Sequence, residues 1–400
     1  MRQFLKRKLV LFNEQGLRSL RAVDIFDELM RFLHHFIAFV GADIFVEHFR
    51  WTFQTYVSFF SLVLFAVNLI YTVTVHWGEW YAVMDTLSIS GIGFQGMIKM
   101  WSGLSNVEFF RKKRADLRSM HARNGRHPEN NYVLLKNVLV ILYIFRFFSV
   151  SYSVAGLFLF VIPGYMLMVR NEEVLLFALE IPTVDPLTHT GYVVTMGYQV
   201  FMVFLAIAGI LAADMGIMII VLHIVGIVDV FRNTMIELDQ LLEDPDCEDD
   251  EIHEKVTEIC MMHKEIIGYE EELNEHYFFT VFVQVITSVT CLSMTLFVIF
   301  MKGDWTRVMF LFATFFQLLE FCALGTSLTL KNDHIVDAIY NTKWYLLCPS
   351  DQKKLQFMLH RSQNAVEMTI GGLALLNMET FVEIIKTIYS YFMMLRSFIE

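Results

Sequence analysis

Polar side chains repeat along an apolar stretch between Gly371 and Glu400. At about 1.5 Å per residue, a helix of this length crosses the roughly 30 Å hydrocarbon core of a bilayer. Steps of three and four residues place several polar side chains on one stripe of that helix, opposite an apolar face. The stripe consists of Thr380, Glu383, Thr387, Ser390, Met394 and Ser397.

Such a stripe favours ion conduction, because polar side chains are costly against lipid and therefore face water or protein. Met394 is the one bulky apolar residue in it, which predicts a hydrophobic constriction near the helix end. A hydrogen-bonded contact between two helices explains the same stripe equally well. A stripe about 100° wide cannot enclose a conduit alone, so a pore requires several copies of the helix around an axis.

The composition is that of a polytopic helical membrane protein. Of the 400 residues 56% are hydrophobic and 38 are Phe, which leaves too little polar surface for an ordinary soluble protein. The net charge of −11 is concentrated in one acidic stretch between Glu237 and Glu275 and near the membrane ends. There is no extended basic face, so we expect no nucleic-acid partner.

Hydrophobic runs predict an all-α membrane protein with seven transmembrane helices. The runs cover residues 54–75, 81–101, 134–162, 192–221, 277–301, 305–328 and 371–400. Most of the 31 Lys and Arg residues lie before the first run and in the loops after the second, fourth and sixth. The positive-inside rule therefore places the N-terminus in the cytosol and the C-terminus outside, the reverse of a G-protein-coupled receptor.

The segments between the spans suggest six regions. Residues 1–53 form a cytosolic N-terminus with an interfacial helix in contact with membrane lipids, and Ile252, Val256, Ile259 and Ile266 predict an amphipathic helix in the acidic loop. The remaining regions are 54–228 with spans one to four, 229–276 as the acidic cytosolic loop, 277–328 with spans five and six, 329–370 as a second cytosolic segment, and 371–400 as the last span.

Metal and enzyme chemistry find little support. His34, His35, Asp43, Glu47 and His48 are spaced around the N-terminal helix rather than at one point, which favours a membrane-surface helix over a metal site. A seven-span membrane hydrolase would need His and Asp clustered within its spans, whereas the histidines near the spans are isolated. We therefore expect no metal, no cofactor and no enzymatic activity.

The C-terminal third carries a set of residues that is specific when taken together. The set consists of Gly325, Ala338, Tyr340, Trp344, Lys353, Lys354, Arg361, Gln363, Gly371, Gly372, Tyr389, Ser390, Tyr391, Phe392 and Leu395. In these residues the chain resembles the insect odorant receptor family. The match is dense over residues 318–395 and elsewhere rests on span layout, loop lengths and the inverted orientation. The chain departs from the family pattern at Ala365, where Pro is common, and at Asn332, where Ser is common.

The resemblance implies one subunit of a tetrameric, ligand-gated, non-selective cation channel in the plasma membrane of sensory neuron dendrites. The seventh helices of such a channel surround the pore, with the gate at Met394 and a polar position at Ser397. The implied pore residues are Glu383, Thr387, Ser390, Met394 and Ser397. The cytosolic ends of spans four to seven form the family's anchor between subunits.

Two related subclasses remain open. The loop between spans four and five is shorter than that of the family's obligate co-receptor, which implies a ligand-tuning subunit that assembles with co-receptor subunits as a heterotetramer. The alternative is a gustatory receptor channel of the same superfamily, since Ser390, Tyr391 and Phe398 fit its closing motif although Ser397 does not.

The resemblance also locates a pocket for a small volatile organic ligand, in the outer half of the membrane domain among spans two, three, four and six. Aromatic and Met side chains suit binding by apolar burial, worth about 25 cal/mol per Å², with one or two hydrogen bonds. Packing between helices explains such side chains as well. The corresponding residues are Met84, Leu87, Ser88, Phe147, Ser151, Tyr152, Ala155, Tyr192, Met196, Gln199, Met309, Phe312 and Phe316.

Ionisable residues within the spans are expensive in hydrocarbon unless they are paired or hydrated. They are Arg146, Asp214, Glu320, Glu383 and Lys386. Glu383 and Lys386, three positions apart, either neutralise each other or leave Glu383 to attract cations to the pore.

Overall fold

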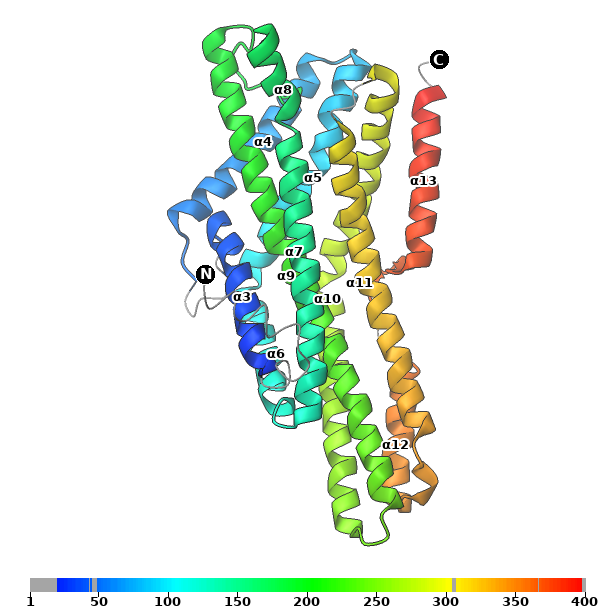
Figure 1. The fold of residues 1–400 in the computed structure, drawn as a ribbon. Coiled ribbons are helices and arrows are strands. Elements are labelled where there is room, and N and C mark those ends of the chain that lie inside the picture. The colour runs from blue at the N-terminus through cyan, green and yellow to red at the C-terminus, as the bar shows by residue number, and fades with distance from the viewer. Residues whose placement is uncertain (1–19, 43, 45–48, 304–306, 366, 398–400) are drawn as a thin grey trace.

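The computed structural model describes residues 20–42, 44, 49–303, 307–365 and 367–397. Five residues named above, Asp43, Glu47, His48, Phe398 and Glu400, lie outside these ranges. In the described residues, long helices run side by side, and some of them extend well beyond the others at one end of the bundle (Figure 1).

The elements follow one another along the chain as helices, with one small hairpin before the last of them. They are α3 Ala22–Val40, α4 Phe53–Val75, α5 Trp80–Ser105, α6 Val107–Asn124, α7 Pro128–Phe158, α8 Val161–Tyr165, the π-helical turn η1 Met166–Arg170, α9 His189–Glu243, α10 Asp249–Lys302, α11 Val308–Asn341, the 3-10 turn η3 Trp344–Leu346, α12 Pro349–Ser362, strands β1 Thr369–Ile370 and β2 Ala374–Leu375, and α13 Met378–Ser397.

The all-α membrane architecture is confirmed. Among the described residues, five helices are long and apolar enough to cross a membrane: 53–75, 128–170, 189–243, 249–301 and 308–341. The second and seventh expected spans correspond to α5 and α13, which are helical but carry more polar side chains. The count of seven spans and the orientation of the termini stay predictions.

Two helices extend far beyond the thickness of a bilayer. α9 has 55 residues and α10 has 54, so at about 1.5 Å per residue each is on the order of 80 Å long. The expected boundaries at 228 and 276 fall inside these continuous helices. Val256, Ile259 and Ile266 of the acidic segment are fully buried. These side chains therefore pack the first part of α10 against neighbouring helices. α12 lies beside the lower ends of α10 and α11 (Figure 1).

The N-terminal helix α3 packs against α7 and α9 through Phe26, Leu29 and Leu33. One face of α3 is therefore part of the protein core. The contact of its other face with the membrane surface stays a prediction. α3 ends at Val40, and the capping residue that follows, Gly41, adopts a left-handed conformation with φ of 75°. A Cβ there would lie 2.3 Å from the backbone nitrogen of Thr55, so the close approach of α4 requires glycine.

The last helix begins later than the apolar stretch that contains it. The sequence predicts helix from Gly371, but Gly371 and Gly372 have φ of 59° and 71° and form the turn between β1 and β2. These left-handed conformations are incompatible with an α-helix, so α13 begins only at Met378. Its first turn is fixed to α11, because the Met378 backbone N–H donates to Thr326 Oγ1 at 2.9 Å.

Candidate functional site

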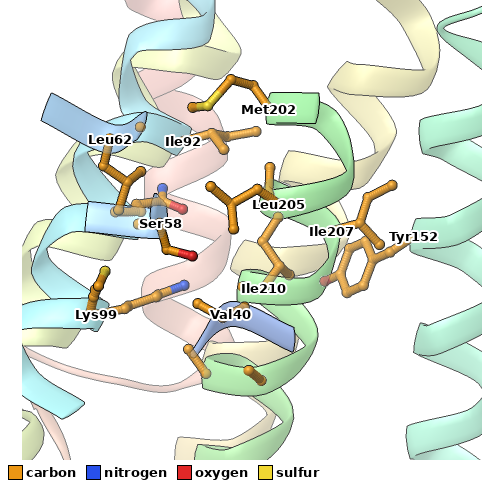
Figure 2. A pocket seen from close by; sticks show the side chains of 18 of the residues that line it. Val40, Ser58, Leu62, Ile92, Lys99, Tyr152, Met202, Leu205, Ile207 and Ile210 are labelled. Atoms are coloured by element: carbon orange, nitrogen blue, oxygen red, sulfur yellow. The ribbon is translucent and has the colours of Figure 1, made fainter. Parts of the chain in front are cut away.

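A cavity of about 250 Å³ lies within the bundle, lined by residues of α3, α4, α5, α6, α7, α9 and α10 and of the first turns of α11. Its wall is mainly apolar. Figure 2 shows side chains of α4, α5 and α9 turned toward a common space, among them Leu62, Ile92, Met202, Leu205 and Ile210. A mainly apolar space of this size suits a small organic molecule.

Three residues that the sequence assigns to the ligand pocket line this cavity: Tyr152, Ala155 and Gln199. Others point elsewhere; Phe147, for example, has 61% of its surface exposed on the outside of α7. The ten predicted positions outside the cavity wall are Met84, Leu87, Ser88, Phe147, Ser151, Tyr192, Met196, Met309, Phe312 and Phe316. Which residues contact a ligand stays a prediction.

Sequence reasoning missed much of the wall. Ser58 and Leu62 come from the first span, which the expected pocket did not include, and Gly93 and Gly96 come from a turn of α5 beyond the positions chosen there. The glycines of α5 were the sequence signal that could have indicated this part of the wall. Gly93 lets Phe65 of α4 pack directly against the α5 backbone, because a Cβ there would lie 2.1 Å from the Phe65 ring.

A short segment, residues 177–180, covers one end of the cavity. Phe177 and Leu179 line the wall, and the Gln199 amide donates to their carbonyl oxygens at 3.0 and 3.2 Å. Gln199 Oε1 in turn accepts from the Phe177 N–H at 3.2 Å, and Thr86 of α5 donates to the Ala178 carbonyl at 2.9 Å. Gln199 therefore holds the covering segment to α9 through both the nitrogen and the oxygen of its side-chain amide.

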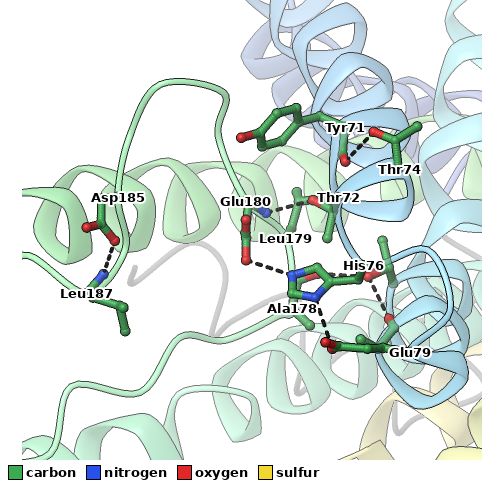
Figure 3. A network of polar contacts seen from close by, with 12 residues as sticks. Tyr71, Thr72, Thr74, His76, Glu79, Ala178, Leu179, Glu180, Asp185 and Leu187 are labelled. Atoms are coloured by element: carbon green, nitrogen blue, oxygen red, sulfur yellow. Dashed lines mark hydrogen bonds and ion pairs between the residues drawn. The ribbon is translucent and has the colours of Figure 1, made fainter.

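The covering segment is also tied to the turn between α4 and α5 (Figure 3). His76 Nε2 lies 2.9 Å from Glu180 Oε1, and His76 Nδ1 lies 3.2 Å from Glu79 Oε2. The Glu180 N–H donates to Thr72 Oγ1 at 2.9 Å. The hydrogen bond to Glu180 raises the pKa of His76 above its usual value, against the opposing effect of burial. The covering segment thus carries a contact whose strength depends on pH.

A buried ion pair lies beside the covering segment. Arg307, just before α11, is 2.7 Å from Asp85 of α5, and its guanidinium lies 5.4 Å from the centre of the Phe177 ring. Both side chains are nearly inaccessible to solvent. The start of α11 is therefore held to α5 at the covered end of the cavity.

A second buried polar cluster lies deeper, at the junction of four helices. Lys99 of α5, which lines the cavity, pairs with Asp214 of α9, and the amide of Gln317 on α11 donates to the other Asp214 oxygen at 2.5 Å. Tyr152 of α7 donates to Glu320 of α11 at 3.4 Å. Asp214 and Glu320, which the sequence marks as expensive in hydrocarbon, are thus hydrogen-bonded within the bundle.

The predicted pore stripe faces away from the rest of the chain. Phe381, Ile388 and Phe392 on the opposite face of α13 are buried, mainly against α10 and α11. α13 stands at one side of the bundle (Figure 1). The exposed stripe residues are Glu383, Thr387, Ser390, Met394 and Ser397.

The hydroxyl groups of Thr387 and Ser390 are satisfied within α13 and need no partner on another helix. Thr387 donates to the Glu383 carbonyl at 2.8 Å, and Ser390 donates to the Lys386 carbonyl at 3.0 Å. The Glu383 carboxylate pairs with Lys386 at 2.7 Å while both side chains remain exposed. Glu383 therefore belongs to an ion pair and to the outward face at once, and its role in a pore stays a prediction.

Within the described ranges, no group of three or more His, Cys, Asp or Glu side chains is arranged to hold a metal ion.

Comparison with known proteins decides the family. Residues 80–389 match the family described as 7tm Odorant receptor, which is more than three quarters of the 400-residue chain. The chain belongs to the insect odorant receptor family. The odorant receptor resemblance inferred from the C-terminal third is therefore confirmed, and the family is one of receptors rather than enzymes.

One relative aligns with most of the receptor and another with about a third of it. It is 21% identical over 383 residues to the putative odorant receptor 83c of Drosophila melanogaster, covering 92% of this chain and 96% of that one. It is 26% identical over 155 residues to odorant receptor Or1 of Anopheles gambiae, covering 36% and 37% of the two chains.

The fold of the receptor is also similar to solved structures. The olfactory receptor OR5 of Machilis hrabei, determined in complex with eugenol, aligns with a TM-score of 0.75 at 14% identity, covering 94% of this chain and 99% of that one. The likeness supports a transmembrane helical receptor fold.

Proposed function

We propose that the receptor is the ligand-tuning subunit of a heteromeric, ligand-gated, non-selective cation channel that depolarises olfactory neurons. It would lie in the plasma membrane of the sensory dendrite, with seven spans, a cytosolic N-terminus and an external C-terminus. The observation that carries the proposal is the covered apolar cavity of about 250 Å³, because a channel that senses a small volatile needs such a site.

The cavity is the proposed ligand site. Its wall supplies apolar surface whose burial favours binding, and the covering segment shields one end from solvent. Tyr152, Ala155 and Gln199 are the predicted ligand residues that line the cavity. Determination of the similar Machilis hrabei receptor in complex with eugenol supports a small organic molecule as the occupant.

A continuous set of contacts joins this site to α13. The Lys99–Asp214 pair reaches Gln317 on α11, and α11 carries Thr326, which accepts from the first backbone N–H of α13. The ring of Phe315 on α11 also packs on Phe381 of α13, with centroids 5.6 Å apart. A ligand that shifts α11 therefore acts on α13 through packed groups, which is how coupling between sites is carried.

The outward face of α13 supports the pore. Its polar stripe is flanked by exposed apolar side chains, including Val382, Tyr389 and Met393, which neighbouring subunits would cover. Four copies of the helix around an axis would line a conduit with Glu383 and Thr387 and narrow it at Met394. A tetramer that includes co-receptor subunits is the assembly that we propose.

Recording of ligand-evoked currents tests the proposal. Cultured cells express the receptor together with a co-receptor, the receptor alone, or the co-receptor alone. Whole-cell currents are then recorded while a broad panel of volatiles is applied. We expect non-selective cation currents that require both chains. Normal surface labelling without any volatile-evoked current would contradict the proposal, and currents evoked by soluble tastants instead would favour the gustatory alternative.

A further inference from the structure

Most polar groups on the cavity wall are already engaged by the protein. The Tyr198 hydroxyl donates to the Ser61 carbonyl at 3.3 Å, and Tyr152 and Gln199 bond to Glu320 and to the covering segment. Gln95 and Lys99 on α5 keep hydrogen-bonding capacity at the wall, as does the Tyr277 hydroxyl on α10, which has no hydrogen-bond partner among the described residues. Gln95 and Lys99 are one helical turn apart and so lie on the same face of α5.

Gln95 presents an unused acceptor. Its Nε2 donates to Thr287 Oγ1 at 2.8 Å, and the Thr287 hydroxyl donates in turn to the Val283 carbonyl at 2.6 Å. Since the Thr287 proton is committed, Thr287 can only accept from Gln95, which fixes the orientation of the amide. Gln95 Oε1 then has no hydrogen-bond partner among the described residues, although Gln95 is only 3% exposed.

Lys99 presents the complementary donor. An ammonium has three N–H groups and no acceptor. Asp214 takes one of them, and the Phe321 ring lies 5.5 Å from the nitrogen. Figure 2 shows Lys99 and Ser58, from α5 and α4, turned into the same part of the cavity, away from Met202. This part of the wall therefore combines a cationic donor with a buried carbonyl that lacks a donor.

We infer that this polar corner selects small alcohols or phenols, an inference that rests on the proposed ligand site. The oxygen of a hydroxyl group accepts from Lys99 while its proton satisfies Gln95 Oε1, so one atom completes both groups. A ketone or an ether has no proton for Gln95. A protonated amine is repelled by Lys99. An ionised carboxylate accepts from Lys99 but has no proton for Gln95 Oε1. The apolar remainder of the cavity takes the hydrocarbon skeleton.

A matched ligand series on the full-length receptor with its co-receptor tests the inference. Compounds that share one carbon skeleton and differ only in the terminal group are compared by the concentration for half-maximal current: alcohol, ketone, methyl ether, primary amine and hydrocarbon. We expect the alcohol to be about tenfold or more potent than the ketone and the ether, as one well-placed hydrogen bond allows.

The variant Gln95→Met should reduce the ratio of alcohol to ketone potency to near one, mainly through a loss of alcohol potency. Met202→Leu, a change on the apolar wall, is the matched control and should keep the ratio. The ligand series on the wild-type receptor does not depend on any variant. It therefore still tests the selectivity if Gln95→Met fails to fold.

The outcomes separate the two claims. Equal potency of alcohol, ketone and ether, or a response to other volatiles but not to alcohols, would overturn the selectivity while leaving the receptor function intact. Silence toward every volatile would instead overturn the proposed function and the selectivity with it.

Discussion

Lys99 of α5, which lines the cavity, forms an ion pair with Asp214 of α9, with side-chain exposures of 7% and 0%. Gln317 of α11 binds the second oxygen of Asp214. One carboxylate thus joins three helices. Because charged groups are costly in a low-dielectric interior, the pair holds these helices in register only as long as both partners are present.

Removal of one partner should be strongly destabilising. Asp214→Ala leaves the Lys99 ammonium buried without a counter-charge, and we expect a loss of about 3–5 kcal/mol in stability. The thermal unfolding midpoint of the purified receptor and its surface level report this loss. The double variant Lys99→Met with Asp214→Leu is the control, since it removes both charges and should recover much of the stability. A single variant as stable as the wild type would contradict the structural role of the pair.

The covering segment should be held more firmly at acidic pH. Glu180 raises the pKa of His76, so the charged form of His76 is favoured in the folded receptor. The stability from this contact is fully present below the unfolded pKa of about 6.5 and is lost as pH rises through the higher folded value.

His76→Gln should therefore lower the thermal midpoint relative to wild type at about pH 5.5 and much less at about pH 8.5. The difference between the two proteins is the relevant quantity, because other groups act in the opposite sense. Burial lowers the pKa of His121 to about 4, which weakens the fold at acidic pH in both proteins. An identical difference at both pH values would show that the contact is not charge-dependent.

Gly325 permits the closest approach between α11 and the segment that leads into α13. A Cβ there would lie 1.8 Å from the Leu376 carbonyl oxygen, and a backbone atom cannot move aside cheaply. Gly325→Ala should therefore destabilise the receptor by about 1–3 kcal/mol and alter gating. Gly268→Ala in α10 is the matched control, because nothing lies within 4 Å of its Cβ and it should stabilise the helix by about 0.5–1 kcal/mol. Equal effects of the two substitutions on the thermal midpoint would refute this account of Gly325.

Met394 should narrow the closed pore. It is the bulky apolar side chain on the exposed stripe of α13, and a hydrophobic constriction excludes water and ions. Met394→Ser should raise the resting cation conductance of cells that express the complete channel. Ser397→Ala, at the next polar position, is the control and should leave the leak low. If Met394→Ser changed neither the leak current nor the ligand response, Met394 would not be the gate.

The sequence was informative where hydrophobic length and periodicity decide the structure. Continuous apolar runs predicted the transmembrane helices, and the spacing of Val256, Ile259 and Ile266 predicted a buried helical face. The start of α13 was missed because Gly371 and Gly372 are apolar enough to extend a hydrophobic run, although they turn a hairpin. Local backbone conformation, rather than hydropathy, set that boundary.

The cavity was harder to predict because its wall depends on how each helix is rotated. Phe147 and Ala155 lie on the same helix, yet only Ala155 faces the cavity. The contribution of Ser58 depends on the placement of α4 against α5, which a family-level pocket does not specify. Pairing partners such as Lys99 and Asp214 come together through tertiary packing across 115 positions of sequence, so spacing gives no sign of them.

The central claim, that the cavity is where a ligand opens the channel, is tested most directly by two neighbouring substitutions on α7. Ala155 lines the cavity, whereas Val154 is 46% exposed on the outside. Concentration–response curves are recorded for Ala155→Trp and Val154→Trp with the co-receptor, at matched surface levels. We expect Ala155→Trp to raise the half-maximal concentration about tenfold or more, equivalent to ~1.4 kcal/mol, and Val154→Trp to leave it unchanged. Wild-type sensitivity in Ala155→Trp, or an equal loss in both variants, would contradict the claim.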